Sequence, residues 1–238
     1  GSVIPGMVGL EAGQSSFGDV YAMFRRVLEF PVRNILPKTL AGKLTEEEIQ
    51  AAVDETCDRI IAELTVEAEK IPLEESTMIA TDWINGRRTP DANQLLQGTI
   101  SGFTLGTTAP QIFRALVEAT AFGTKAIVDR FVSEGCPIES VIGIGGIALK
   151  SPFVMQTMSD VLNMPIKVCN TDQACALGAA MFAATAAGVY PKVEDAIAAM
   201  NSGFAKEYQP DVQRHSQYAA LYETYLKLGD FTEKELYR

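Results

Sequence analysis

Apolar and polar positions follow two periods along this chain, one helical and one strand-like. From Ile49 to Ile71 the apolar residues recur at spacings of three, four or seven, which predicts an amphipathic helix ended by Pro72. Thr45 and Glu48 stand in front of this helix with the spacing of a capping box. Short runs rich in strand-forming residues predict strands at 77–80, 98–103, 141–144 and 166–168.

Helical periods and turn residues account for most of the remaining chain. Pro31 and Pro37 are expected to frame a loop, and 82–97 has the composition of a polar loop. Residues 3–10 are rich in strand formers but contain a proline and a glycine, which predicts a short or irregular strand. Because strands alternate with helices, the expected fold class is an α/β layered domain. Further helices are expected at 17–28, 109–134, 152–162, 192–200 and 211–228.

The predicted helix at 109–134 carries small residues on its apolar side. Thr120, Gly123 and Thr124 fall on the same side as its large apolar residues. Another part of the molecule is therefore expected to approach the helix backbone closely there. Phe122 points the opposite way, which predicts burial on two faces.

One stretch, from Gln173 to Pro191, contains no charged residue. This is nearly the length needed to span a membrane. Its residues are mostly alanine and glycine, however, so we expect a tightly packed core helix in place of a membrane span. Asp172 is placed to cap that helix.

Composition narrows the classes of function. The chain has 238 residues with a hydrophobic fraction of 47% and a formal net charge of −10. This acidity argues against nucleic-acid and anionic-membrane partners, which both need basic patches. Residues 45–75 hold eleven acidic and two basic side chains, so nearly all the excess charge lies there. A solvated acidic helix face is expected, and an acidic docking surface is the alternative.

The cysteines do not have the spacing of a zinc site. The chain has four cysteines and one histidine, and no metal-binding pattern joins them. Mostly buried free thiols in a reducing cytosol are expected. No segment at the start of the chain has the pattern of a signal peptide, so the expected location is cytoplasmic.

A pair of glycines follows the predicted strand at 141–144. Gly145 and Gly146 would let the backbone turn sharply and let a ligand approach without interference from a Cβ atom. Ser151 and Pro152 then have the pattern of a helix start, whose amides could face an anion. The pattern indicates a nucleotide-binding turn, and a strand–helix crossover that binds nothing is the alternative.

A second candidate segment begins at Glu11. Its carboxylate stands beside small residues in EAGQS, where it could hold hydroxyl groups, and a turn followed by a helix cap is the alternative. Trp83 is interpreted as a packing anchor, with a sugar-stacking platform as the alternative.

Several segments resemble the FGGY family of carbohydrate kinases. The stretch GTISGFTLGTTAPQIFRALVEATAFGTKAI at 98–127 is similar to a family signature, and 143–166 is similar to the family's adenosine motif. The segment 172–184 is similar to the helix that follows that motif. Within the family, the segments 3–24 and 82–90 resemble the L-ribulokinase branch. The resemblance implies an actin-like (RNase H-like) fold, with a mixed sheet flanked by helices.

The resemblance also implies that this is one part of a larger enzyme. Family members are about twice as long and have two lobes, and residues 1–238 resemble only the C-terminal lobe. The chain opens with Gly1-Ser2 and no initiator methionine, which is consistent with a piece of a longer chain. The implied partner is the N-terminal lobe of the same polypeptide. That lobe would carry the catalytic aspartate, so the chain alone is expected to be inactive.

The implied reaction is transfer of the γ-phosphate of ATP, bound with Mg²⁺, to L-ribulose. Glu11 matches a residue that contacts sugar hydroxyls. Lys150 stands where related kinases often have asparagine. The resemblance places nucleotide-binding residues at Gly18, Ala22, Gly145, Gly146 and Lys150.

Two other functions stay open at this point. The chain could belong to a kinase for another pentulose or a polyol, or to a nucleotide-binding regulatory module of the same fold that is not an enzyme. Sequence leaves the oligomeric state undetermined, and an apolar face between lobes would favour self-association into a homo-oligomer.

Overall fold

The computed structural model describes residues 3–236, so Gly1-Ser2 lies outside the described residues. The chain folds into two compact units. The first unit comprises residues 1–13 and 127–215, and the second comprises 14–126 and 216–238. Each unit is built from two separate stretches of the sequence.

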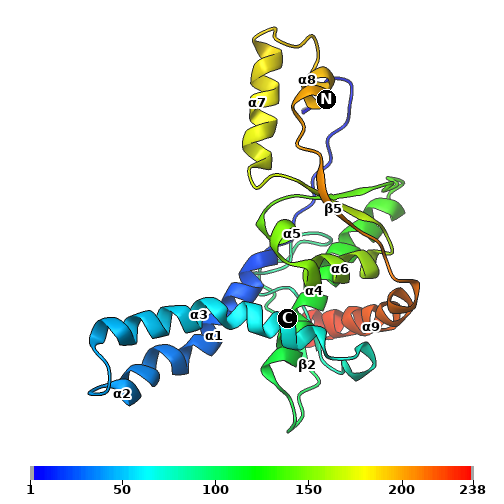
Figure 1. The fold of residues 1–238 in the computed structure, drawn as a ribbon. Coiled ribbons are helices and arrows are strands. Elements are labelled where there is room, and N and C mark those ends of the chain that lie inside the picture. The colour runs from blue at the N-terminus through cyan, green and yellow to red at the C-terminus, as the bar shows by residue number, and fades with distance from the viewer. Residues whose placement is uncertain (1–2, 237–238) are drawn as a thin grey trace. The chain divides into compact units, whose positions relative to one another are not determined.

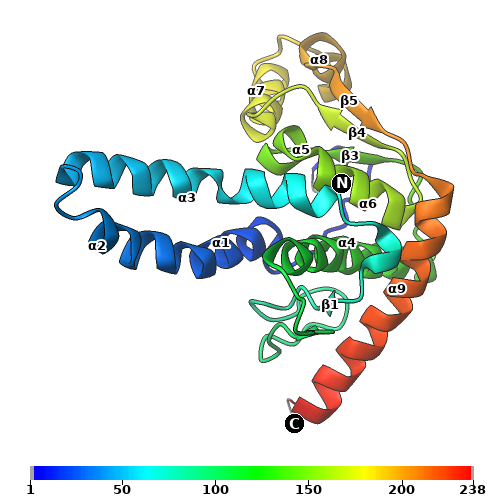
Figure 2. The ribbon, with the colours of Figure 1, turned by 60° about the horizontal axis from the view of Figure 1, so that its bottom comes forward.

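A helical hairpin opens the second unit. The helices α1 and α3 lie side by side and antiparallel, with the short α2 at their turn (Figures 1 and 2). The expected loop between Pro31 and Pro37 is wrong, because α1 continues through Pro31 and stops at Asn34. The packing of α1 against α3 outweighs the cost of the hydrogen bond that a proline removes from a helix interior. The bounds are Phe17–Asn34 for α1, Leu36–Leu40 for α2 and Glu46–Glu69 for α3.

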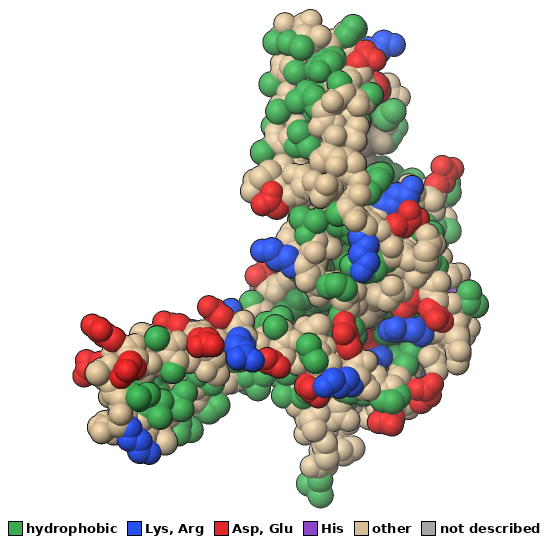
Figure 3. Space-filling view, viewed as in Figure 1, with side chains coloured by type: hydrophobic (Ala, Val, Ile, Leu, Met, Phe, Trp, Pro, Cys, Tyr) green, Lys and Arg blue, Asp and Glu red, His purple; other side chains and the backbone are tan. Residues whose placement is uncertain are grey.

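The capping box predicted for the acidic helix is confirmed. The Thr45 hydroxyl accepts a hydrogen bond from the Glu48 amide at 3.2 Å, and the Thr45 amide donates to the Glu48 carboxylate at 2.9 Å. Two hydrogen bonds lower the pKa of the Glu48 carboxyl group. The bond from the Thr45 amide has the larger effect, and the bond from the Thr45 hydroxyl has the smaller one. The acidic side chains of α3 are exposed, as the solvated-face interpretation expects (Figure 3).

The core of the second unit forms around α4. This helix runs from Ala109 to Ser133, and its residues up to 126 belong to this unit. Phe122 is fully buried, and its ring lies 5.5–6.2 Å from those of three tyrosines on α9. The expected burial of two faces of α4 is confirmed, since the opposite side carries Thr120 and Gly123, also buried. The other elements are η1 (Leu73–Glu75), β1 (Ile79–Ala80), β2 (Ile100–Ser101), α9 (Val212–Phe231) and η2 (Thr232–Leu236), with β1 antiparallel to β2.

A three-stranded mixed sheet organises the first unit. β3 pairs parallel with β4, and β4 pairs antiparallel with β5, so β4 is central. The helices α5 and α6 connect β3 to β4 (Figure 2). Sequence reasoning missed β5, because four of its five residues are exposed and show no apolar alternation. The bounds are β3 Val141–Gly143, α5 Gly146–Lys150, α6 Pro152–Leu162, β4 Ile166–Cys169 and β5 Phe204–Tyr208.

The alanine-rich helix corrects one prediction. α7 spans Ala174–Ala186 and packs against α8, Val193–Met200. Among the residues of α7 only Met181 is buried, so the expected tightly packed core helix is wrong for this chain. Uniformly small side chains give a helix no apolar stripe, and composition alone therefore could not place its faces. Asp172 is not the cap either, because Gln173 occupies that position.

Three smaller expectations also have outcomes. Residues 3–7 form bends and turns and residues 8–10 have no regular structure, so the expected short or irregular strand is wrong. All four cysteines are free, but Cys57 alone of them is buried, which contradicts the expectation of mostly buried thiols. Within residues 3–236, no helix is both long and apolar enough to cross a membrane.

Candidate functional site

The glycine pair in the first unit forms an open turn. β3 ends at Gly143, and Gly145 follows in a left-handed conformation with φ +87° at the start of α5. Residues with a Cβ atom rarely adopt that backbone conformation, which accounts for glycine at this position. Gly146 is exposed and has no positive φ. A Cβ atom built on either glycine would meet nothing within 4 Å.

This openness tests whether the turn fits a nucleotide. Neither backbone strain nor crowding by the described chain requires glycine at Gly146, and the bare backbone there faces open space. A flat group such as the adenosine of a nucleotide could contact such a surface directly. The residues of the turn therefore leave room for a nucleotide.

A short helix stands between the turn and the predicted helix. Sequence reasoning missed α5, which has five residues and ends at Lys150. The helix start predicted at Ser151 and Pro152 is confirmed, because Ser151 caps α6, its hydroxyl accepting a hydrogen bond from the Val154 amide at 3.5 Å. The first amides of the longer helix thus lie beyond α5, so the glycine turn is separated from them in sequence. Lys150 is exposed.

The structure places the other candidate residues on two segments. Glu11 is exposed, in the segment without helix or strand that precedes α1, and belongs to the first unit. Gly18 and Ala22 lie one turn apart on α1 in the second unit, and both are half-buried. The structure thus brings together Gly145, Gly146 and Lys150 on α5, and Gly18 with Ala22 on α1.

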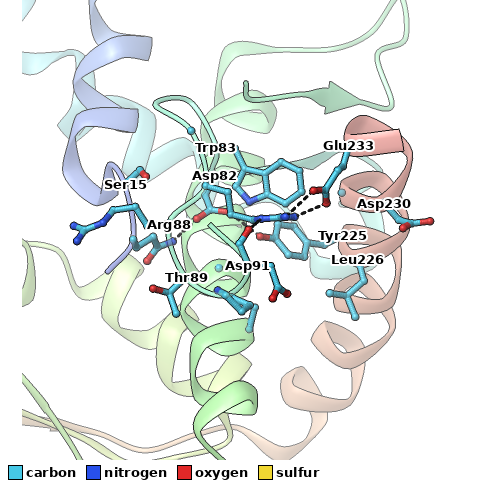
Figure 4. Close-up of a pocket in the computed structure, with 17 residues that line it drawn as sticks. Ser15, Asp82, Trp83, Arg88, Thr89, Asp91, Tyr225, Leu226, Asp230 and Glu233 are labelled. Atoms are coloured by element: carbon cyan, nitrogen blue, oxygen red, sulfur yellow. Dashed lines mark hydrogen bonds and ion pairs between the residues drawn. The ribbon is translucent and has the colours of Figure 1, made fainter. Parts of the chain in front are cut away.

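Sequence reasoning missed a buried carboxylate in the second unit. Asp82 follows β1 and is 5% exposed. One of its oxygens accepts a hydrogen bond from the Tyr225 hydroxyl at 2.7 Å, and the other accepts one from the Gln14 amide at 2.7 Å. Figure 4 shows Asp82 and Tyr225 from their separate elements on the wall of one cavity.

Gln14 lies against the small residues of α4. Its amide nitrogen also donates to the Thr120 carbonyl at 2.9 Å, and its amide oxygen accepts from the Thr124 hydroxyl at 3.0 Å. A Cβ atom on Gly123 would lie 2.5 Å from the Gln14 amide nitrogen and 2.7 Å from the Asp82 carboxyl carbon. The expected close approach to this side of α4 is confirmed. The small residues signalled the approach, but nothing in their pattern identified which side chains make it.

Burial dominates the electrostatics of the cluster. It raises the pKa of Asp82, against the hydrogen bonds from Tyr225 and Gln14, which act to lower it. Burial likewise raises the pKa of the Tyr225 hydroxyl, and the neighbouring Asp82 charge raises it further. Both groups are thus biased towards their protonated forms.

An aromatic and ionic layer lines the same cavity, which has a volume of about 210 Å³. Arg87 forms a two-bond ion pair with Glu233 at 2.8 and 2.9 Å, and its guanidinium lies 4.8 Å from the centre of the Trp83 ring (Figure 4). Trp83 is buried, which fits its interpretation as a packing anchor. Gly229 makes room for it, since a Cβ there would lie 2.8 Å from the indole. Among the described residues, no three metal-ligating side chains form a cluster that could hold an ion.

Comparison with known proteins identifies relatives across nearly the whole chain. The model of the FGGY family of carbohydrate kinases, C-terminal domain, matches residues 1–187. The ribulokinase of Vibrio parahaemolyticus is 46% identical over 98% of this chain and 40% of its own length. That of Bacillus licheniformis is 38% identical, again over 98% and 40%. The chain therefore spans about 40% of the length of these curated relatives.

Solved structures show the fold. A xylulose kinase from Rhodospirillum rubrum matches with a TM-score of 0.67 and 23% identity, covering 91% of this chain and 39% of its own. A Plasmodium falciparum glycerol kinase, solved with ADP, matches with a TM-score of 0.58 and 24% identity, over 70% and 33%. The expected actin-like α/β fold is confirmed by these neighbours. This chain belongs to the FGGY family of carbohydrate kinases and corresponds to the family's C-terminal domain.

Proposed function

We propose that this chain is the nucleotide-binding lobe of a kinase that phosphorylates L-ribulose. The observation that carries the nucleotide part is the open turn at Gly145 and Gly146, where bare backbone faces space that the described chain leaves unfilled. The sugar part is supported by relatives named ribulokinase that match 98% of the chain.

In this proposal the turn holds the adenosine of ATP. Gly145 supplies the sharp change of direction after β3, and Gly146 supplies a surface with no side chain. Lys150 lies at the end of the same short helix and contacts the nucleotide. The family resemblance adds Gly18 and Ala22, which lie on α1, as nucleotide-binding residues. Because a glycine and an alanine project little, they allow a ligand to lie close to the helix backbone.

The bound ATP supplies the phosphoryl group, together with the Mg²⁺ that neutralises its phosphates. The described residues contain no metal-ligand cluster, which favours delivery of the ion with the nucleotide. Glu11 accepts hydrogen bonds from sugar hydroxyls and orients the substrate. An exposed carboxylate on a segment free of regular structure is accessible for that role.

The remaining machinery belongs to a partner lobe. Relatives extend well beyond the matched 40% of their length, and we place the carboxylate that accepts the sugar hydroxyl's proton in their N-terminal part. Closure of the two lobes would exclude water from the transferring phosphoryl group. The chain by itself therefore binds nucleotide but transfers no phosphate, and the expected location of the enzyme is the cytoplasm.

A chimera tests the proposal directly. The part of the V. parahaemolyticus ribulokinase that precedes the matched region is joined to this chain, and ADP release is measured with Mg-ATP. L-ribulose, D-ribulose, D-xylulose and glycerol are assayed in parallel. We expect turnover with a strong preference for L-ribulose, and none from the isolated chain. Preference for another sugar would refute the substrate, and no turnover with any of them would refute the kinase function.

Glu11→Gln in the chimera tests the sugar contact. The amide keeps the size of the side chain but loses the charge that strengthens hydrogen bonds from hydroxyls. The KM for L-ribulose is expected to rise about tenfold, equivalent to roughly 1.4 kcal/mol, with the KM for ATP unchanged. Glu69→Gln, at an exposed carboxylate at the end of α3, is the matched control.

A further inference from the structure

We propose that Gln14 and Asp82 are positioning residues that anchor the segment carrying Glu11, so that its carboxylate is held where the sugar binds. This inference deepens the proposed function and rests on it. The observations that carry it lie within the second unit, in the cluster where Gln14 contacts Asp82 and α4.

The Gln14 side chain is fixed because its hydrogen-bonding capacity is engaged at both ends. Its amide nitrogen donates both hydrogens, one to Asp82 and one to the Thr120 carbonyl, and its oxygen accepts from the Thr124 hydroxyl. An amide held in this way cannot rotate without breaking all three bonds. Gly123 leaves the space in which the amide lies.

The two serine side chains that follow Gln14 do not provide a comparable hold. The hydroxyl oxygens of Ser15 and Ser16 are buried without a hydrogen-bond partner in the structure. Ser16 stands at the cap position of α1, yet makes no side-chain capping bond. Of these three consecutive polar side chains, Gln14 therefore anchors the chain just before α1.

This anchor lies close to Glu11 along the chain. The two residues are three positions apart, so their Cα atoms are separated by at most about 10 Å even in extended chain. The segment around Glu11 has no helix or strand of its own, and a point fixed three residues away limits how far the carboxylate can move. Loss of the anchor should thus weaken sugar binding before it affects the nucleotide turn at Gly145.

Asp82 joins the two sides of this cluster. One of its oxygens accepts a hydrogen bond from Tyr225 and the other accepts one from Gln14. The Gln14 amide is consequently oriented with its nitrogen towards Asp82. Tyr225 supports Asp82 from the side away from Gln14, and it can be removed separately.

The test replaces the Gln14 amide in the chimera described above. Gln14→Glu exchanges the nitrogen that donates to both Asp82 and the Thr120 carbonyl for an oxygen, so at least one of these bonds is lost and the anchor opens. We expect the KM for L-ribulose to rise about tenfold, with kcat and the KM for ATP within about twofold. Gln14→Leu removes all three bonds without adding a carboxyl group, and should raise the KM for L-ribulose by a similar factor.

Tyr225→Phe is the matched control. It removes the other hydrogen bond of Asp82 and leaves Gln14 intact, so it should lower the urea midpoint without changing the KM for L-ribulose. Equal changes in the KM for L-ribulose for Gln14→Glu and Tyr225→Phe would show that the cluster only stabilises the fold. An unchanged KM for L-ribulose in Gln14→Leu would also overturn the inference.

A measurement without catalysis separates this inference from the proposed function. Hydrogen–deuterium exchange of the peptide covering residues 3–13 should increase at least fivefold in Gln14→Glu and stay unchanged in Tyr225→Phe. Unchanged exchange in Gln14→Glu would overturn the inference whether or not the chimera is active. If the chimera with the native sequence releases no ADP, the proposed function fails, while exchange still decides whether Gln14 anchors the segment.

Discussion

Two glycine sites, one in each unit, differ in what surrounds them. Gly123 on α4 is buried under Gln14 and Asp82, and a Cβ atom would collide with both. Gly145 and Gly146 face open space, and a Cβ atom there would meet nothing within 4 Å. Glycine is required at the first site by the chain's own packing. At the second site the described chain imposes only the backbone conformation of Gly145.

The difference separates stability from binding. Where the chain itself fills the space above a glycine, substitution should unfold the protein. Where that space is open, substitution should spare the fold and affect only a ligand that occupies it. Each prediction below either breaks this contrast or makes it sharper.

The largest effect is expected from Gly123→Ala. The new methyl group must displace the Gln14 amide and the Asp82 carboxyl group, which combines overpacking with the loss of buried hydrogen bonds. Against this, alanine gains about 1 kcal/mol of helix propensity over glycine. We expect a net loss of about 3 kcal/mol in the free energy of unfolding, measured by urea denaturation.

Gly178→Ala is the control for that measurement. Gly178 lies inside α7, and a Cβ atom built there meets nothing within 4 Å. The same substitution should therefore stabilise the chain by up to about 1 kcal/mol through helix propensity alone. Equal responses at Gly123 and Gly178 would show that the crowding around Gly123 relaxes without cost, and the contrast would fail.

The pH dependence of stability should follow from the buried carboxylate. The pKa of Asp82 is raised by burial above its usual 3.8, so the folded chain binds this proton more tightly than the unfolded chain does. The stability that this proton contributes is fully present at a pH below the pKa of Asp82 in the unfolded chain. It is lost as the pH rises towards the pKa of Asp82 in the folded chain. The slope has a limit of about 1.4 kcal/mol per pH unit for one proton.

Asp82→Asn should remove that slope. Relative to the native sequence, the variant gains stability as the pH increases from 4 to 8, measured by urea denaturation at each pH. Asp91→Asn is the control, because Asp91 lines the same cavity but is exposed. An unchanged slope in Asp82→Asn would show that Asp82 ionises in the folded chain as readily as in the unfolded one.

The two sites also differ in how far sequence predicted them. The glycine turn was found because a β-branched run followed by Gly145-Gly146 is a local pattern, and the family resemblance marked the same residues. The Asp82 cluster joins residues up to 143 positions apart, such as Asp82 and Tyr225, and no local period links them. The small residues on α4 predicted that another part of the chain packs closely there. A single sequence contains no information on which distant side chain makes that contact.

The fold errors have the same origin. The capping box and the long amphipathic helices were predicted correctly, since neighbouring residues determine them. The loop expected at Pro31 and the buried position expected for α7 were wrong, because contacts with other elements determine whether a helix continues or is covered. Sequence reasoning missed β5 for a related reason. Its mostly exposed residues pair with β4 through the backbone, and their side chains show no pattern that would predict a strand.

A moderate effect is expected from Gly145→Ala. Its φ of +87° is a conformation that a Cβ atom disfavours, although space around it is open. A loss of about 1 kcal/mol in the free energy of unfolding should result, smaller than that for Gly123→Ala. A loss as large as that of Gly123→Ala would mean that the turn is as tightly packed as the buried site, which contradicts the contrast.

The smallest effect on stability should come from Gly146→Ala, which is also the sharpest test of the contrast. With no positive φ and nothing within 4 Å, the methyl group should change the free energy of unfolding by less than about 0.5 kcal/mol. If ATP lies on this backbone as proposed, the same methyl group occupies its space and should weaken Mg-ATP binding about tenfold. Displacement of a fluorescent nucleotide analogue measures this, with Gly178→Ala as the matched open glycine. Unchanged affinity in both variants would leave Gly146 an ordinary surface glycine and remove the turn from the proposed nucleotide site.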